Sequence, residues 1–150
     1  MFGVLVLSQG GLAAELVAAA EMVAGRSIPV EALGLEWRMS PEHAQRTVEA
    51  RLREMNRGEG VLILTPVYGD TPTNLAVALS EPSRYEVVAG VNLPMLLRIG
   101  CQNLSDLSVS EAARLLEEKG RQAVGRATAS AHGVSPTGSF HVPAGKEPCE

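Results

Sequence analysis

The sequence predicts an α/β fold, a three-layer α/β/α sandwich built around a mostly parallel sheet. Two observations lead to this prediction. Short continuous runs of Val, Leu and Ile recur along the chain, as in strands that are buried on both faces. Between these runs, apolar residues recur at helical spacing. Strands that alternate with helices require right-handed crossovers and a parallel sheet covered on both faces.

The first two expected strands frame a helix. Residues 2–7 form the first apolar run, and a helix follows from Leu12, with Gly25 as its C-terminal stop. Residues 30–35 form a weaker strand that carries Glu31, which suits the edge of a sheet.

The second helix and third strand carry clearer signals. Ser40 and Pro41 suit the N-cap and first position of a helix. Its buried stripe would consist of Ala44, Val48, Leu52 and Met55. Residues 61–64 are the most apolar segment, so we expect them to lie centrally in the sheet.

The second half continues the alternation. Thr71 begins a short helix that ends near residue 79, residues 85–91 form a fourth strand, and a helix starts near Met95. Ser108 and Glu111 have the spacing of a capping box, for a helix that ends near Gly120. Residues 123–128 could add one more short strand.

Composition divides the 150-residue chain into one domain and a tail. Residues 1–128 hold all the periodic segments. Residues 129–150 are rich in Ser, Gly, Pro, Ala and Thr, with little apolar area to offset the entropy of ordering. We therefore expect them to form a flexible tail.

Charge and hydropathy argue against several classes of partner. The net charge is −4 and the arginines are dispersed, whereas nucleic-acid binding requires a concentrated basic patch. No apolar run reaches the ~20 residues that span a bilayer, and the N-terminus lacks the basic region of a signal peptide. Cys101 and Cys149 lie far apart, and we expect both to stay reduced. These features predict a cytoplasmic protein without membrane insertion, cofactor or metal.

Two loops define a candidate site. They follow the first and third strands, which we expect to be neighbours, and each leads into a helix N-terminus that favours an anion. In parallel sheets, ligands bind beyond the carboxyl ends of such strands. The predicted crevice and partner-binding residues are Ser8, Gly10, Gly11, Thr65, Tyr68, Gly69, Asp70 and Thr71.

Three motifs show a resemblance to a known family. The opening Ser-Gln-Gly-Gly-Leu-Ala of residues 8–13, the Tyr-Gly-Asp-Thr-Pro-Thr-Asn of residues 68–74 and the Val-Asn-Leu-Pro-Met-Leu of residues 91–96 resemble the IIA component of the mannose-family bacterial sugar phosphotransferase system. Gly120 and Arg121 match a further Gly-Arg pair. The resemblance extends to about residue 128.

The resemblance implies a phosphocarrier fold and role. In that family, a histidine after the first strand accepts a phosphoryl group from HPr, the histidine-containing carrier, and passes it to a IIB domain. An aspartate after the third strand orients the histidine. The family forms homodimers in which a C-terminal strand is exchanged between subunits. Here the acceptor position is Gln9 and the aspartate position is Pro66.

These two replacements decide the predicted function. The lone pair of a carboxamide nitrogen is delocalised, so Gln9 cannot carry a transferable phosphoryl group. Pro66 cannot orient an imidazole. We therefore expect a IIA-like regulatory or interaction module rather than an enzyme. Two alternatives stay open: an active phosphocarrier that uses a non-standard acceptor, and a sensor of anions or small molecules.

Several residues carry competing interpretations. His43 suits a solvated helix face better than an acceptor role, and His132 and His141 fall in the tail. Tyr68 should pack against the crevice rim, with partner recognition as the alternative. Asp70 could cap the next helix, repel an incoming phosphoryl group, or do both.

Overall fold

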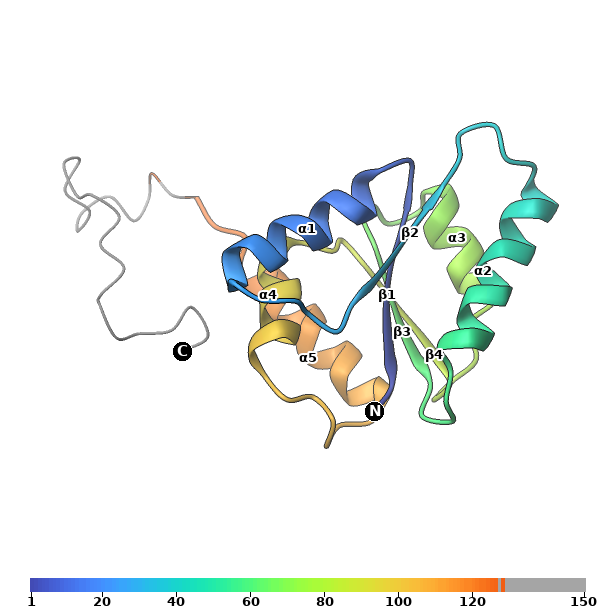
Figure 1. Cartoon of the computed structure of the whole chain (residues 1–150). Helices are drawn as coiled ribbons and strands as arrows, with labels where there is room; N and C mark the ends of the chain where they lie inside the picture. Colours follow the sequence, from blue (N-terminus) through green and yellow to red (C-terminus); the bar gives the residue numbers. More distant parts are fainter. Residues whose placement is uncertain (127, 129–150) are drawn as a thin grey trace.

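The computed structural model describes residues 1–126 and residue 128, in which strands and helices alternate around a single sheet (Figure 1). The elements are β1 (Gly3–Gln9), α1 (Leu12–Ala24), β2 (Glu31–Leu35), α2 (Pro41–Met55), β3 (Val61–Thr65), α3 (Thr71–Ala78), β4 (Tyr85–Ala89), α4 (Leu93–Cys101) and α5 (Val109–Gln122). Apart from a strand at residues 123–128, every element expected from the sequence is present, with small differences at the ends.

The sheet has four parallel strands in the order β2-β1-β3-β4. β1 and β3 are central, and all five residues of β3 are buried, which confirms the central position predicted for this strand. β2 lies at the edge, also as predicted. Because β2 and β3 flank β1 on opposite sides, the chain reverses its direction across the sheet between β1 and β3.

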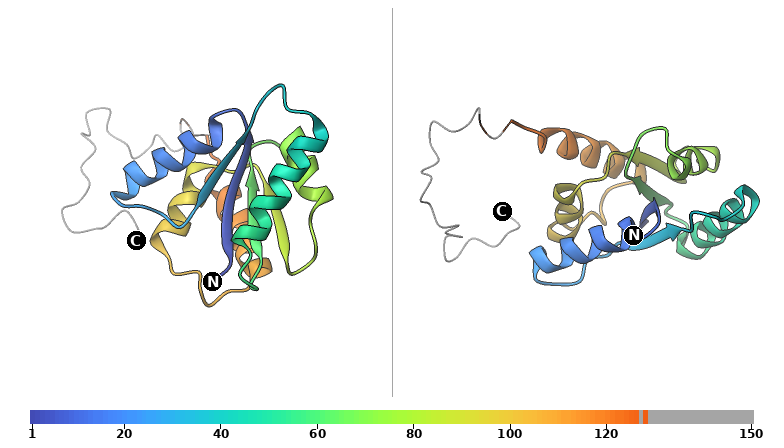
Figure 2. Two further views of the ribbon diagram at one scale, coloured as in Figure 1. Left: turned by 45° about the vertical axis from the view of Figure 1, so that its right-hand side comes forward. Right: turned by 90° about the horizontal axis from the view of Figure 1, so that it is seen from above.

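Helices cover both faces of the sheet. α1, α4 and α5 lie on one face, and α2 and α3 on the other (Figure 2). Alternate β1 side chains enter the two cores, with Val4 and Val6 on the α1 side and Leu5 and Leu7 on the α2 side. This two-sided burial explains the continuous apolar runs in the sequence. The three-layer α/β/α prediction is confirmed.

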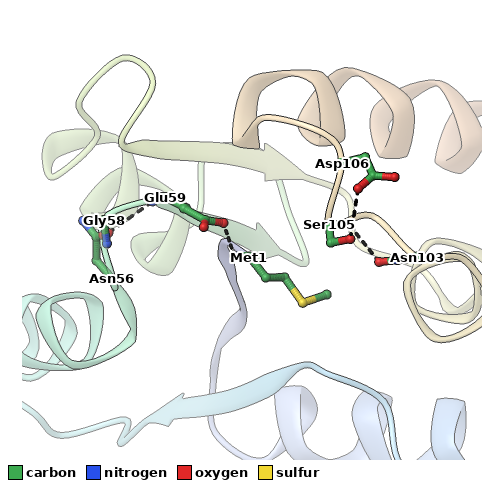
Figure 3. Close-up of polar contacts among 8 residues, drawn as sticks. Met1, Asn56, Gly58, Glu59, Asn103, Ser105 and Asp106 are labelled. Carbon is green, nitrogen blue, oxygen red and sulfur yellow. Dashed lines mark hydrogen bonds and ion pairs between the residues drawn. The ribbon is translucent and has the colours of Figure 1, made fainter.

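Polar contacts order the loop before β3 and tie it to the start of β1, at the amino ends of the strands (Figure 3). The Asn56 side chain accepts hydrogen bonds from the backbone N–H groups of Gly58 and Gly60 at 2.9 and 3.1 Å. The N-terminal ammonium group of Met1 forms an ion pair with Glu59 in the same region. These contacts organise the end of the sheet opposite the candidate site.

Two expectations require correction. Residues 123–126 form a turn and irregular chain in place of the strand expected over 123–128, and exposed Val124 supplies no buried apolar face there. Cys101 is disulfide-bonded, so the expectation of a reduced thiol is wrong for this residue. Cys149 and the predicted tail at 129–150 lie outside the described residues, as do His132 and His141.

Candidate functional site

The candidate site lies where the carboxyl ends of β1 and β3 meet. These strands are neighbours, as expected from the sequence. The loop after β1 leads to α1 on one face of the sheet, and the loop after β3 leads to α3 on the other (Figure 1). Such a reversal point opens a crevice in α/β sheets, and it is the usual place for a ligand.

A recess of about 300 Å³ opens at this point. We call it the Gln9 recess. Its walls come from the end of β1, the loop between β2 and α2, and the first turns of α2 and α3. The lining residues are Gln9, Leu35, Glu36, Trp37, Met39, Pro41, Ala44, Thr71 and Leu75. Of the expected site residues, the structure therefore places Gln9 and Thr71 in one recess.

The Gln9 side chain is held by the neighbouring strand. Its Nε2 atom donates a hydrogen bond to the carbonyl oxygen of Leu35 at 3.1 Å. The backbone N–H of Gly10 donates to the same oxygen at 2.8 Å. The half-buried amide is thus oriented by backbone. It is neutral and non-nucleophilic, and it offers hydrogen bonding rather than covalent chemistry.

The turn after Gln9 packs against the indole of Trp37. Gly10 has a φ of 61°, a left-handed conformation that glycine adopts at little cost. A Cβ atom at this position would lie 3.2 Å from Nε1 of Trp37. Trp37 nevertheless leaves 81% of its surface exposed. It therefore forms a projecting wall of the Gln9 recess.

At the N-terminus of each of the helices α1 and α3, one backbone N–H is already bound by a protein side chain. The buried Ser8 hydroxyl accepts a hydrogen bond from the backbone N–H of Ala13 at 2.8 Å. The Asp70 carboxylate accepts one from Thr73 N–H at 2.8 Å, which confirms the predicted cap. Pro72, in the first turn of α3, has no N–H to offer. Both helix ends have thus used part of their capacity to bind an anion.

The Thr65 hydroxyl is also engaged within the protein. Thr65 is fully buried, and its Oγ1 lies 2.7 Å from Oγ1 of Thr73. The Thr73 hydroxyl lies equally close to the carbonyl oxygen of Val67. Because Thr73 has a single hydroxyl proton and a carbonyl can only accept, Thr65 donates to Thr73 and Thr73 donates to Val67. This chain ties the end of β3 to the start of α3.

Other expected site residues lie outside the Gln9 recess. Tyr68 is 90% exposed, so the prediction that its ring packs against the crevice rim is wrong. It borders a separate pocket of about 390 Å³ between β4, α4 and α5. His43 is exposed in the first turn of α2 and does not line the recess. Pro66 is half-buried and directly follows β3.

Sequence reasoning missed Glu36 and Trp37. Both lie in the loop after β2, which crosses to the Gln9 recess. The available signal was the single tryptophan of the chain, placed in a loop with no hydrophobic pattern around it. Among the described residues, no three His, Cys, Asp or Glu side chains gather as metal ligands would. No helix in residues 1–126 is both long and apolar enough to cross a membrane.

Comparison with known proteins identifies the family. The family model described as the PTS system fructose IIA component matches residues 3–117. The mannose-specific EIIAB component of the PTS from Escherichia coli strain K12 is 32% identical over 125 residues, covering 81% of this chain and 38% of that protein. The chain thus spans little more than a third of this relative. The putative phosphotransferase enzyme IIA component YadI from the same strain is 34% identical over 98 residues, covering 64% and 66% of the two chains.

Solved structures agree with this result. The mannose/sorbose-specific IIA subunit from Enterococcus faecalis superposes with a TM-score of 0.74 at 26% identity, covering 83% of this chain and 93% of the other. The EIIA component from Streptococcus agalactiae has a TM-score of 0.73 at 20% identity, covering 86% and 99%, and supports the fold alone. By sequence and by fold, the chain belongs to the mannose-type IIA components of the sugar phosphotransferase system.

Proposed function

We propose that this chain is a IIA-type module that docks other components of the phosphotransferase system without carrying a phosphoryl group. The observation that carries the proposal is Gln9 itself. It stands at the end of β1, where the resemblance places the acceptor histidine, with its amide held by the Leu35 carbonyl oxygen. Pro66 stands where the resemblance places the orienting aspartate. Nucleophile and orienting residue are absent together.

The chemistry of the recess supports this proposal. A phosphoryl acceptor needs an available lone pair on a nucleophilic atom, often activated by a neighbouring base. The Gln9 amide lacks one, and the hydroxyls of Ser8 and Thr65 are buried and hydrogen-bonded. Glu36 is the single ionisable side chain among the residues that line the recess. His43 lies outside it, which weakens the case for a relocated acceptor.

The proposed partners are HPr and a IIB component. The name of the Escherichia coli relative, a mannose-specific EIIAB component, joins A and B components in one protein. Exposed apolar side chains at the carboxyl end of this sheet suit a protein interface, namely those of Leu12, Trp37, Val67 and Tyr68. Trp and Tyr are the residues most often found as anchors of protein interfaces.

A homodimer is also part of the proposal. β4 is an edge strand, with β3 as its single paired neighbour among the described strands. Unpaired edges readily accept another strand, and the resemblance implies an exchanged C-terminal strand. Sedimentation of the full chain at several concentrations would test this. A monomer at high micromolar concentration would contradict it.

A phosphotransfer assay tests the main proposal. The full chain is incubated with phosphoenolpyruvate, the first enzyme of the system and HPr, and its intact mass is then measured. We expect no added phosphoryl group, while a histidine-bearing IIA protein run in parallel becomes labelled. A stoichiometric adduct that passes to a IIB component would reject the proposal. Substituting His43, His132 and His141 in turn would then locate the acceptor.

A further inference from the structure

We propose that the Gln9 recess distinguishes the two states of HPr and binds the unphosphorylated form more tightly than the phosphorylated one. This inference rests on the proposed docking function. It adds to that function a preference for one form of HPr, and this preference is opposite to that of a phosphocarrier, which must bind phosphorylated HPr to receive its phosphoryl group.

The charge at the recess supports this direction. Glu36 lines the recess, and no described residue forms an ion pair with it. Arg38, two residues further along the same loop, is not among the lining residues. Asp70 adds a second carboxylate immediately before Thr71, which also lines the recess. A phosphoryl group brought to this site would meet like charges.

The backbone donors that could offset this repulsion are partly engaged. At α1, Ser8 accepts the N–H of Ala13. At α3, Asp70 accepts the N–H of Thr73 and places its negative charge against the positive end of the helix dipole. Pro72 supplies no N–H in the same turn. The recess therefore has added negative charge, and one backbone donor at each helix end is already engaged.

The exposed aromatic side chains supply attraction that does not depend on phosphate. Aromatic residues make up 3% of the chain. Phe2 and Tyr85 are buried, whereas Trp37 and Tyr68 are exposed in loops at the carboxyl end of the sheet. Such anchors gain affinity from apolar contact. HPr without its phosphoryl group would retain these contacts and avoid the repulsion.

Titration calorimetry with the full chain tests the inference. One arm uses unphosphorylated HPr, and the other uses HPr kept phosphorylated by phosphoenolpyruvate and the first enzyme. We expect the phosphorylated form to bind more weakly at low ionic strength, by a factor of up to about ten. Added salt should reduce this ratio, because partly exposed charges are screened. The intact mass is checked after each titration.

Charge-removing variants isolate the cause. In Glu36→Gln and Asp70→Asn the side-chain shape is kept, and Asn can still cap α3, so the ratio of the two affinities should fall. Trp37→Ala should weaken both forms alike. Equal or tighter binding of phosphorylated HPr would overturn the inference and leave docking intact. Binding of neither form, or of a IIB component alone, would overturn the inference together with HPr docking.

Discussion

Gly34 in β2 lies so close to the turn after β1 that a Cβ atom at position 34 would be 2.1 Å from the carbonyl oxygen of Gly10. This approach lies next to the two hydrogen bonds that Gln9 and Gly10 donate to Leu35. Glycine is required here because one backbone passes directly over another. The position of Gln9 thus depends on a residue in a different strand.

Replacing this glycine should disturb both stability and the recess. In Gly34→Ala the turn must move, and we expect the free energy of unfolding to fall by about 1–3 kcal/mol. Urea denaturation followed by circular dichroism measures this loss. Gly125→Ala is the matched control, because a Cβ there meets no atom within 4 Å and should change stability by less than about 0.5 kcal/mol. Equal effects at the two positions would contradict the packing argument.

Ser8 gives a second prediction. Its hydroxyl is the acceptor for the N–H of Ala13, and both residues are fully buried. Ser8→Ala leaves this N–H without a partner away from water, so unfolding should become easier by about 1–3 kcal/mol. Ser80→Ala removes an exposed hydroxyl that donates to Val77, and should be nearly neutral. A neutral Ser8→Ala would show that this hydrogen bond does not stabilise the start of α1.

The sequence predicted the sheet well because its strands are buried on both faces. Such strands give unmistakable apolar runs, as at β3, where every residue is buried. The prediction of a strand at 123–128 was wrong because this segment lacks such a buried apolar run. It contains Gly125 and an exposed Val124, and no neighbouring strand covers it within the described residues.

The site was harder to predict because one of its walls depends on tertiary structure. The loops after β1 and β3 lie side by side because these two strands are parallel neighbours in the sheet. Trp37 and Glu36 reach the recess because the chain after β2 bends across it. No local periodicity encodes that path. The engagement of Ser8 with Ala13 likewise depends on the angle at which α1 leaves the sheet.

The motifs that identify the family are partly structural. Asn92 caps α4 by accepting the N–H of Met95 at 3.2 Å, and its side chain donates to the carbonyl oxygen of Gly120 at 3.2 Å. A Cβ at position 120 would lie 2.7 Å from the Met95 sulfur atom. These residues join α4 to α5. They report the fold and say nothing about phosphoryl transfer.

Glu111 provides a prediction about pH. Hydrogen bonds from the Ser108 hydroxyl, and then from its backbone N–H, lower the pKa of Glu111 below its ordinary value. A carboxyl whose pKa is lower in the folded state stabilises the protein above the unfolded pKa, and this contribution disappears as pH falls through the folded pKa. The wild type should therefore be more stable than Glu111→Gln at pH 7, and the difference should vanish in acid. A difference in melting temperature that persists at the acid end would contradict this.

The last prediction restores the missing chemistry. In Gln9→His, a ring N–H can donate to the Leu35 carbonyl oxygen that now accepts from the amide, which leaves the other ring nitrogen as the nucleophile. Adding Pro66→Asp supplies a carboxylate after β3 that can accept the ring N–H in place of the Leu35 carbonyl oxygen and fix the tautomer, so we expect it to speed labelling by HPr. Gln9→Asn is the control and should stay unlabelled. Adding His43→Gln to the double variant should leave labelling unchanged, because His43 lies outside the Gln9 recess. A double variant that folds, binds HPr and stays unlabelled would contradict this prediction.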